Sequence, residues 1–378
     1  MRIVTLSLVV VLMAAACGGG EENKSEDLLV QDLLTGDSVE EIVAPVTKEW
    51  HLVDGAVIQG LSKLRGFGCN DDWLYVNVEG AGNKGLFAWQ FSEEPALEQI
   101  FGGVGVTEVL GSGALVANYT PNGTTAVIGV DTEGIATDMG FAFETLEVRS
   151  LSYTGTHLVT FSKDWSSAYY LVHRAKLPDG PFEQVGPHFL ATGMGLYASP
   201  ETIYVLTGSD PLLGTACHQA PVTAGAAAGY EPCPLFPNFV EDKPGEPYSV
   251  NAQLYGNGHR LGLWFRVSYK GEQSARHFVA SNKNKWSEVE GIPAIEPASW
   301  FHDGDNIYVG LTKSGGKAAV WTAPWDGEAA AEAIGEGLPS TGDKTGVAGI
   351  CLAGNQLYAA WYEYNPGGST VQLYRRTR

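Results

Sequence analysis

Charged side chains are scarce in this sequence, and basic side chains are the scarcest of all. Asp, Glu, Lys and Arg make up 17% of the 378 residues, against roughly 25% in an average soluble domain. The chain has only 23 Lys and Arg but 43 Asp and Glu, which gives a formal net charge of −20. Phosphate backbones and anionic lipid headgroups would repel such a chain, so we expect no nucleic acid among its partners and no direct electrostatic binding to a lipid surface.

The sequence also lacks the composition of a helical or disordered protein. Apolar residues make up 44% of the chain, aromatic residues make up 11%, and there are 48 glycines. This mixture excludes disorder, a coiled coil and a long-helix bundle, and it favours a turn-rich all-β protein.

Catalytic and cofactor signatures are missing as well. The chain contains no Gly-x-Ser-x-Gly, no His-Glu-x-x-His and no Walker loop, which are the signatures of serine hydrolases, zinc peptidases and nucleotide-binding enzymes. No Cys-x-x-Cys or His-x₃-His spacing provides a zinc site. We therefore expect no metal and no cofactor, and we consider an enzyme less favoured than a binding protein.

The first apolar stretch of the chain is short. Residues 3–16 are nearly all apolar and follow the basic Arg2. At about 1.5 Å per residue this stretch cannot cross a hydrocarbon core of about 30 Å, so it predicts a secretion signal and not a membrane-spanning helix. No later apolar run approaches 18 residues.

The stretch ends in Ala-Ala-Ala-Cys-Gly at residues 14–18, which resembles the lipobox of bacterial lipoproteins, although that family usually has Leu three residues before the cysteine. The resemblance implies that a signal peptide of residues 1–16 is removed and that Cys17 carries diacylglycerol, with palmitate-type chains holding the protein in the membrane. Gly18 replaces the Asp of the inner-membrane retention signal, which implies an outer-membrane address in the cell envelope, periplasmic or surface-exposed. The alternative is an ordinary secretory signal cut near Ala16.

Residues 17–47 have a composition that cannot bury a core. Their eight acidic side chains against the single Lys24 predict a disordered tether after the lipidated Cys17. The acidic residues are Glu21, Glu22, Glu26, Asp27, Asp32, Asp37, Glu40 and Glu41. We expect the folded domain to span residues 48–378.

A turn followed by an apolar strand recurs seven times along this domain. The strands begin 41 to 58 residues apart, at Leu74, Leu115, Leu158, Ile203, Leu261, Ile307 and Leu357. Three further β segments surround each of them, and four strands in about 45 residues are typical of a β-propeller blade. We therefore predict a single seven-bladed β-propeller with four-stranded blades, although no particular propeller family is matched. A pair of β-sandwiches and a β-helix are the alternatives.

The two ends of the domain predict how the ring closes. The last repeat lacks an outer strand, and residues 48–55 resemble residues 284–291, which lie in the outer strand of an earlier repeat. We expect the N-terminal strand, residues 48–54, to complete the last blade and so remove an open edge.

Four cysteines remain after Cys17, and an oxidising compartment favours disulfides between them. Cys69 and Cys351 occupy the same place in the first and last repeats, and Cys217 and Cys233 flank one turn in the fourth repeat. The repeat therefore predicts the pairs Cys69–Cys351 and Cys217–Cys233. Free buried thiols are the alternative.

Candidate ligand-binding residues come from one set of loops and from the innermost strands. The loops between second and third strands open on one face of a propeller, and four of them carry an aromatic residue that could stack on a sugar or grip a peptide. These residues are Tyr119, Trp165, Tyr269 and Tyr364. Arg65 and Arg149 lie on predicted innermost strands, where a sialidase would place three arginines. Packing of the loops and lining of a water-filled channel are the simpler interpretations.

Together these patterns predict a lipid-anchored extracytoplasmic propeller, expected to be monomeric, that binds a glycan, a peptide or a protein partner without catalysis. The alternative is a glycan-processing enzyme, a glycoside hydrolase or lyase with its site at the channel mouth. A glycosidase would require two carboxylates about 5–9.5 Å apart there.

Overall fold

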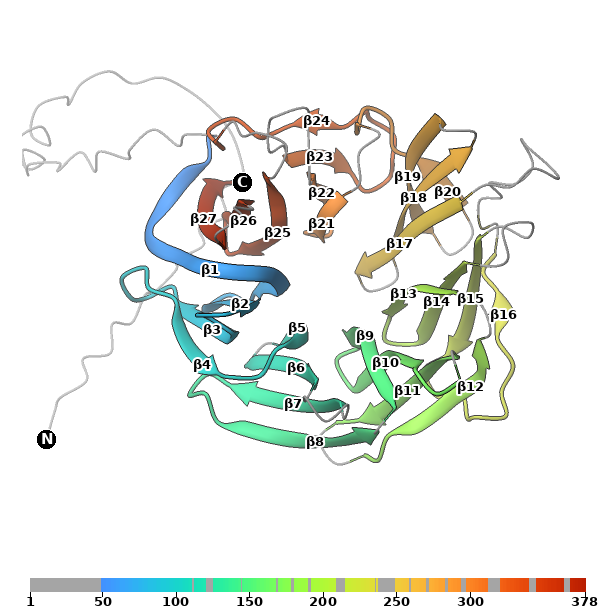
Figure 1. The fold of residues 1–378 in the computed structure, drawn as a ribbon. Helices are drawn as coiled ribbons and strands as arrows, with labels where there is room; N and C mark the ends of the chain where they lie inside the picture. Colours follow the sequence, from blue (N-terminus) through green and yellow to red (C-terminus); the bar gives the residue numbers. More distant parts are fainter. Residues whose placement is uncertain are drawn as a thin grey trace, which may run out of the picture. The chain divides into compact units, whose positions relative to one another are not determined.

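A computed structural model describes most of the chain after residue 48 (Figure 1). The described residues are 49–378 without 111, 120–124, 144, 168, 178–179, 190–191, 209–214, 235, 237–248, 258–259, 270–271, 283–284, 294–296, 312–319, 340–344 and 364–367. The expected signal peptide, Cys17 and the tether of residues 17–47 lie outside them. Residues Thr47–Arg378 form one compact unit.

All regular secondary structure in the described part of the chain is β-strand, as the composition predicts. None of the described residues forms a helix that is long and apolar enough to cross a membrane. Five sheets have four antiparallel strands each, in chain order, and stand around a common axis with the first strand of each sheet innermost (Figure 1).

The five four-stranded sheets are formed by β5 (Gly105–Leu110), β6 (Gly113–Tyr119), β7 (Thr125–Asp131) and β8 (Ala136–Phe143); β9 (Leu146–Tyr153), β10 (His157–Asp164), β11 (Tyr170–Lys176) and β12 (Glu183–Phe189); β13 (Thr192–Ala198), β14 (Thr202–Gly208), β15 (Thr215–Pro221) and β16 (Glu231–Pro232); β17 (Ser249–Asn257), β18 (Arg260–Tyr269), β19 (Glu272–Asn282) and β20 (Lys285–Glu288); and β21 (Pro297–His302), β22 (Asn306–Leu311), β23 (Val320–Pro324) and β24 (Glu332–Ala333).

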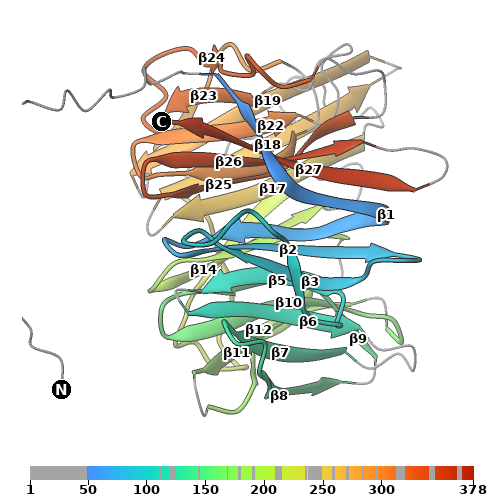
Figure 2. The same ribbon diagram turned by 90° about the vertical axis from the view of Figure 1, so that its left-hand side faces the viewer.

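A sixth sheet joins the two ends of the domain and has seven strands. In order it contains β25 (Thr345–Ala353), β26 (Gln356–Glu363), β27 (Ser369–Thr377), β1 (His51–Cys69), β2 (Trp73–Gly80), β3 (Gly85–Gln90) and β4 (Glu98–Phe101). Its long strand β1 crosses from the last strands of the chain to the first ones, as the side view shows (Figure 2).

The prediction of seven separate four-stranded blades is wrong, because the described residues form five such blades. All seven repeated strands exist, but β2 and β26 belong to the same sheet. The physical reason is the length of β1, which pairs with β27 from His51 to Leu61 and with β2 from Leu61 to Cys69. One sheet therefore runs from the last repeat into the first, with register shifts along β1, and a count of repeats could not reveal this.

The expected pairing of the N-terminal strand with the last strand is present. His51 lies opposite Arg375 and Leu52 lies opposite Tyr374. Just before them the indole of Trp50 is 2% exposed, and its Nε1 donates to the carbonyl of Ile334 over 2.5 Å. The start of the domain is thus packed against residues from its last third.

Both predicted disulfides are confirmed. Cys69 and Cys351 are bonded with a Cα–Cα distance of 5.7 Å, and Cys217 and Cys233 with a Cα–Cα distance of 5.3 Å. The first bond links the end of β1 to β25, two strands of the seven-stranded sheet that are not hydrogen-bonded neighbours.

The core lies between neighbouring sheets and is densest around their second strands. In β18, for example, Leu263, Trp264 and Phe265 are each at most 2% exposed. A strand that is covered on both faces has a continuous run of apolar residues, and this is the pattern from which these strands were predicted. This packing fixes the innermost strands, whose ends carry the candidate site.

Candidate functional site

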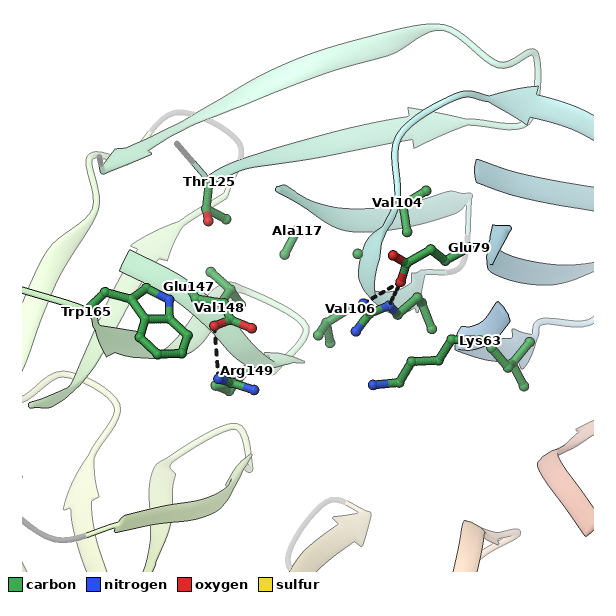
Figure 3. Close-up of a pocket in the computed structure, with 13 residues that line it drawn as sticks. Lys63, Glu79, Val104, Val106, Ala117, Thr125, Glu147, Val148, Arg149 and Trp165 are labelled. Carbon is green, nitrogen blue, oxygen red and sulfur yellow. Dashed lines mark hydrogen bonds and ion pairs between the residues drawn. The ribbon is translucent and has the colours of Figure 1, made fainter. Parts of the chain in front are cut away.

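A cleft of about 620 Å³ lies between the second half of the long strand β1, at Lys63–Arg65, and the beginnings of the innermost strands β5 and β9. Its volume is in the range of pockets that take small ligands, about 300–1,000 Å³. Figure 3 shows Trp165, Glu147 and Arg149 on one side of the cleft and Lys63 and Glu79 on the other.

Two arginine–glutamate pairs form the polar part of the wall. Arg65 of β1 donates from Nε to Glu79 Oε2 of β2 over 2.7 Å, and its Nη2 forms a second contact with the same oxygen. Arg149 Nη2 lies 2.9 Å from Glu147 Oε2, two residues away on β9. Both pairs are partly exposed, and such pairs contribute only about 0–1 kcal/mol to folding. Stability alone therefore does not explain them.

Cations outnumber carboxylates in this cleft. Lys63 also lines the wall, and among the described residues it forms no ion pair. Lys163, at the end of β10, places its Nζ 3.7 Å from the ring centroid of Trp165. The cleft thus carries a local positive excess in a chain whose formal net charge is −20, and it is suited to an anionic ligand.

Trp165 provides an exposed aromatic surface at the rim. Its side chain is 56% exposed, and the Arg149 guanidinium lies 5.7 Å from its ring centroid. An exposed large aromatic ring has no role in the core, and flat rings of this kind stack on sugars and other ligands.

The turn that carries Trp165 is fixed by local hydrogen bonds. Asp164 accepts hydrogen bonds from the hydroxyls of Ser166 and Ser167 and from the backbone N–H of Ser166. These bonds, with the Ser167 hydroxyl contributing most, lower the pKa of Asp164 to about 2. The backbone N–H of Trp165 donates to Thr145 over 3.0 Å, so the ring is presented from an ordered turn.

One hydroxyl in the wall is left without a partner among the described residues. Thr125, at the start of β7, is 1% exposed, and its Oγ1 accepts and donates no hydrogen bond there. Four other buried hydroxyls in the described part of the chain are unpaired in the same way, those of Tyr75, Thr160, Ser162 and Tyr255, so this atom does not by itself mark a ligand position.

Of the six residues predicted to bind a ligand, the structure brings three together. Arg65, Arg149 and Trp165 all line the cleft. Tyr119 ends β6, where its backbone pairs with Thr125 of the cleft wall, and Tyr269 ends β18, far along the chain; their side chains are not among those described. Tyr364 lies outside the described residues.

Lys63, Glu79 and Glu147 also line the cleft and were not predicted from the sequence. Lys63 and Glu147 each stand two residues before a predicted arginine on the same strand, and residues i and i+2 of a strand lie on one face. That spacing was the signal that could have found them. Glu79 is set opposite Lys63 by the pairing of β1 with β2, which the sequence does not reveal.

A half-buried carboxyl elsewhere on β5 was not predicted either. Burial raises the pKa of Glu108 to about 7, while a backbone hydrogen bond involving Tyr153 acts in the opposite direction. Glu108 does not line the cleft. Among the described residues no group of three potential metal ligands is found.

The comparisons with known proteins concern the fold. No protein-family model matches the chain, and no curated protein matches it. An oligogalacturonate lyase from Vibrio parahaemolyticus superimposes with a TM-score of 0.58 at 8% identity, over 86% of this chain and 93% of that one. The β-propeller domain of the Trilobed protease from Pyrococcus furiosus, described as having an open velcro topology, gives a TM-score of 0.54 at 10% identity, over 82% of this chain and 97% of that one.

The chain is a β-propeller. An acylaminoacyl peptidase from Pyrococcus horikoshii gives a TM-score of 0.54 at 12% identity, and the match covers 85% of this propeller but only 53% of that protein. At these identities the similarity shows the fold and nothing about activity, because propellers serve many unrelated functions.

Proposed function

We propose that this propeller is a non-catalytic binding module for an anionic glycan, which it holds in the cleft between Lys63 and Trp165. We also propose that it works outside the cytoplasm, attached to the outer membrane through a lipid on Cys17. The two disulfides and the lipobox-like sequence at residues 14–18 support this location, because disulfides persist in oxidising compartments.

The observation that carries the proposal is the local charge of the cleft. Three cations and two carboxylates line it, and Lys163 and Asp164 beside Trp165 add one further cation and one further carboxylate, in a chain with nearly twice as many acidic as basic residues. An acidic ligand would be repelled by most of the protein and attracted here. Because the two arginines already share their charge with Glu79 and Glu147, we assign the strongest attraction to Lys63.

The aromatic ring selects a saccharide among anionic ligands. Trp165 offers an exposed flat surface next to Arg149, and a sugar ring can stack on it while its carboxylate meets the cations. One of the similar structures carries the name oligogalacturonate lyase, which is compatible with a saccharide ligand for a propeller of this size.

Binding is favoured over glycoside hydrolysis by the state of the two carboxylates in the cleft. A glycosidase pair needs one carboxylic acid that gives its proton to the leaving group. Glu79 and Glu147 are each engaged by an arginine, so neither is free for that role.

The proposal is tested by incubating the purified protein with an array of neutral and carboxylated glycans and scoring both binding and cleavage. We expect retention of carboxylated glycans without cleavage, and weakening of that retention by about tenfold or more in Trp165→Ala but not in Trp165→Tyr, which keeps a flat ring. Arg276→Ala is the matched control, because Arg276 forms a comparable exposed pair with Glu288 outside the cleft. Release of shortened products would show an enzyme instead, and binding indifferent to Trp165→Ala would place the site elsewhere.

A further inference from the structure

A second cavity adjoins the cleft on the side away from β1. Its volume is about 480 Å³, and it lies along the innermost strands β9, β13 and β17. Arg149 lines both cavities. The two hollows are therefore neighbours that share one side chain, and they follow the ring of innermost strands from β1 to β17.

We propose that these cavities are adjacent subsites of one groove and that the natural ligand is an oligosaccharide of at least two units. An acidic unit occupies the cleft beside Lys63 and Trp165, and the unit linked to it occupies the second cavity, with Arg149 at the junction. This inference rests on the proposed function, since it assumes that the cleft binds an anionic sugar.

The second cavity has the chemistry of a site for an uncharged sugar. Among its described lining residues Arg149 is the only charged one, and that guanidinium is already paired with Glu147. The remaining polar side chains are Ser150, Gln253 and Tyr170, next to the apolar Leu196 and Leu254. Hydroxyl and amide groups beside apolar surface suit the hydroxyls and carbon face of a neutral hexose.

Gln253 is oriented for this role by a neighbouring sheet. Its Oε1 accepts a hydrogen bond from Trp300 Nε1 over 3.2 Å. Among the described residues its Nε2 has no partner, so its N–H groups remain available to donate to a sugar hydroxyl. The fixed oxygen makes this amide a donor toward the ligand.

Gly195 provides a way to block the second subsite without disturbing the first. It lines the second cavity only, and a Cβ placed there would meet Leu254 N at 3.5 Å and Leu254 Cβ at 3.9 Å, which are ordinary contacts. Its φ is not in the left-handed region. Gly195→Leu would therefore fill the cavity with a side chain and leave the backbone as it is.

The test compares a uronic acid monosaccharide with a disaccharide in which the same uronic acid is linked to a neutral hexose, titrated calorimetrically into the full-length protein. We expect the disaccharide to bind wild type about tenfold more tightly or better, as an added set of buried contacts would give. Gly195→Leu should abolish this gain and leave the affinity for the monosaccharide unchanged. Gln253→Ala should reduce the gain in the same selective way, which keeps the test valid if Gly195→Leu fails to fold.

The outcomes separate this inference from the proposed function. Lys63→Ala should weaken both ligands, and Arg276→Ala should weaken neither. Equal affinity for the two ligands, or a gain that survives both Gly195→Leu and Gln253→Ala, would overturn the second subsite while leaving the cleft intact. Failure of both ligands to bind wild type would overturn the proposed function itself, and the second subsite with it.

Discussion

Cys69 and Cys351 are joined by a disulfide although 282 residues separate them, and their Cα atoms lie 5.7 Å apart. Cys69 is the last residue of β1, and Cys351 lies in β25. The bond therefore adds a covalent link between the first and last parts of the propeller, in addition to the hydrogen bonds between β1 and β27.

Loss of this bond should destabilise the propeller more than loss of the local one. Closing a long loop restricts the unfolded chain more than closing a short loop does, and removing a native disulfide costs about 2–5 kcal/mol. We expect the Cys69→Ser/Cys351→Ser variant to unfold at lower urea concentration than the matched Cys217→Ser/Cys233→Ser variant, whose loop spans 16 residues. Equal midpoints would show that the long bond contributes no special stability to the ring.

Trp50 should matter for folding far more than the exposed Trp165. Trp50 is 2% exposed and donates to Ile334, whereas Trp165 is 56% exposed. Removing a buried Trp costs about 3–5 kcal/mol, and a surface substitution about 0.5 kcal/mol or less. Urea unfolding of Trp50→Ala and Trp165→Ala measures the loss of stability in each variant. A similar loss in the two variants would contradict the packing of the N-terminal strand described above.

Two buried histidines should make the fold acid-sensitive. Burial lowers the pKa of His173 to about 4 and that of His277 to about 3, below the value of about 6.5 in an unfolded chain. Between these values only the unfolded state takes up the protons, so the stability is complete above pH 6.5 and falls as the pH drops below it. The loss should be roughly 1–2 kcal/mol per histidine at pH 5.

Urea midpoints measured at pH 7.5 and pH 5 check this dependence. Replacing both histidines by Gln should reduce the difference between the two midpoints. Glu108 has the opposite sign, because burial raises its pKa to about 7 and its protonation stabilises the folded state as the pH falls through that value. A Glu108→Gln variant should therefore show a steeper loss toward acid than wild type. If the urea midpoint changed between pH 7.5 and pH 5 by the same amount in wild type and in the double Gln variant, this would contradict the buried, neutral state of the two histidines.

The proposed lipid attachment through Cys17 predicts the effect of replacing this cysteine. Cys17→Ser should remain an unlipidated precursor, because the serine oxygen replaces the sulfur that receives the diacylglycerol in lipoproteins. Labelling of expressing cells with a radioactive fatty acid reads this out, with Cys351→Ser as a cysteine control that should still be labelled. Equal incorporation by Cys17→Ser and wild type would rule out lipidation at this position.

The parts of the fold that repeat could be predicted from the sequence, and the parts that depend on pairing between distant segments could not. The equivalent places of Cys69 and Cys351 in their repeats were enough to predict their bond. The number of separate blades was not predictable in the same way, since β1 pairs along both of its edges and its sequence does not show where one sheet should end.

The candidate site was predictable to the same extent. Arg65, Arg149 and Trp165 were found from their strand and loop positions, because a propeller gathers these positions at one end. Lys63 required attention to the residue two places before Arg65. Glu79 and Gln253 reach their cavities only through strand pairing and the packing of neighbouring sheets, which are tertiary properties.

The most direct test of the central claim, that the cleft binds an anionic glycan, uses one ligand in two forms. A uronic acid-containing oligosaccharide and its carboxyl-reduced, neutral counterpart are titrated into wild type and Lys63→Ala at two salt concentrations. We expect wild type to bind the acidic form at least about tenfold more tightly than the neutral one, and we expect this preference to shrink in Lys63→Ala and at high salt. Equal binding of the two forms by wild type, or a preference for the neutral form, would contradict it.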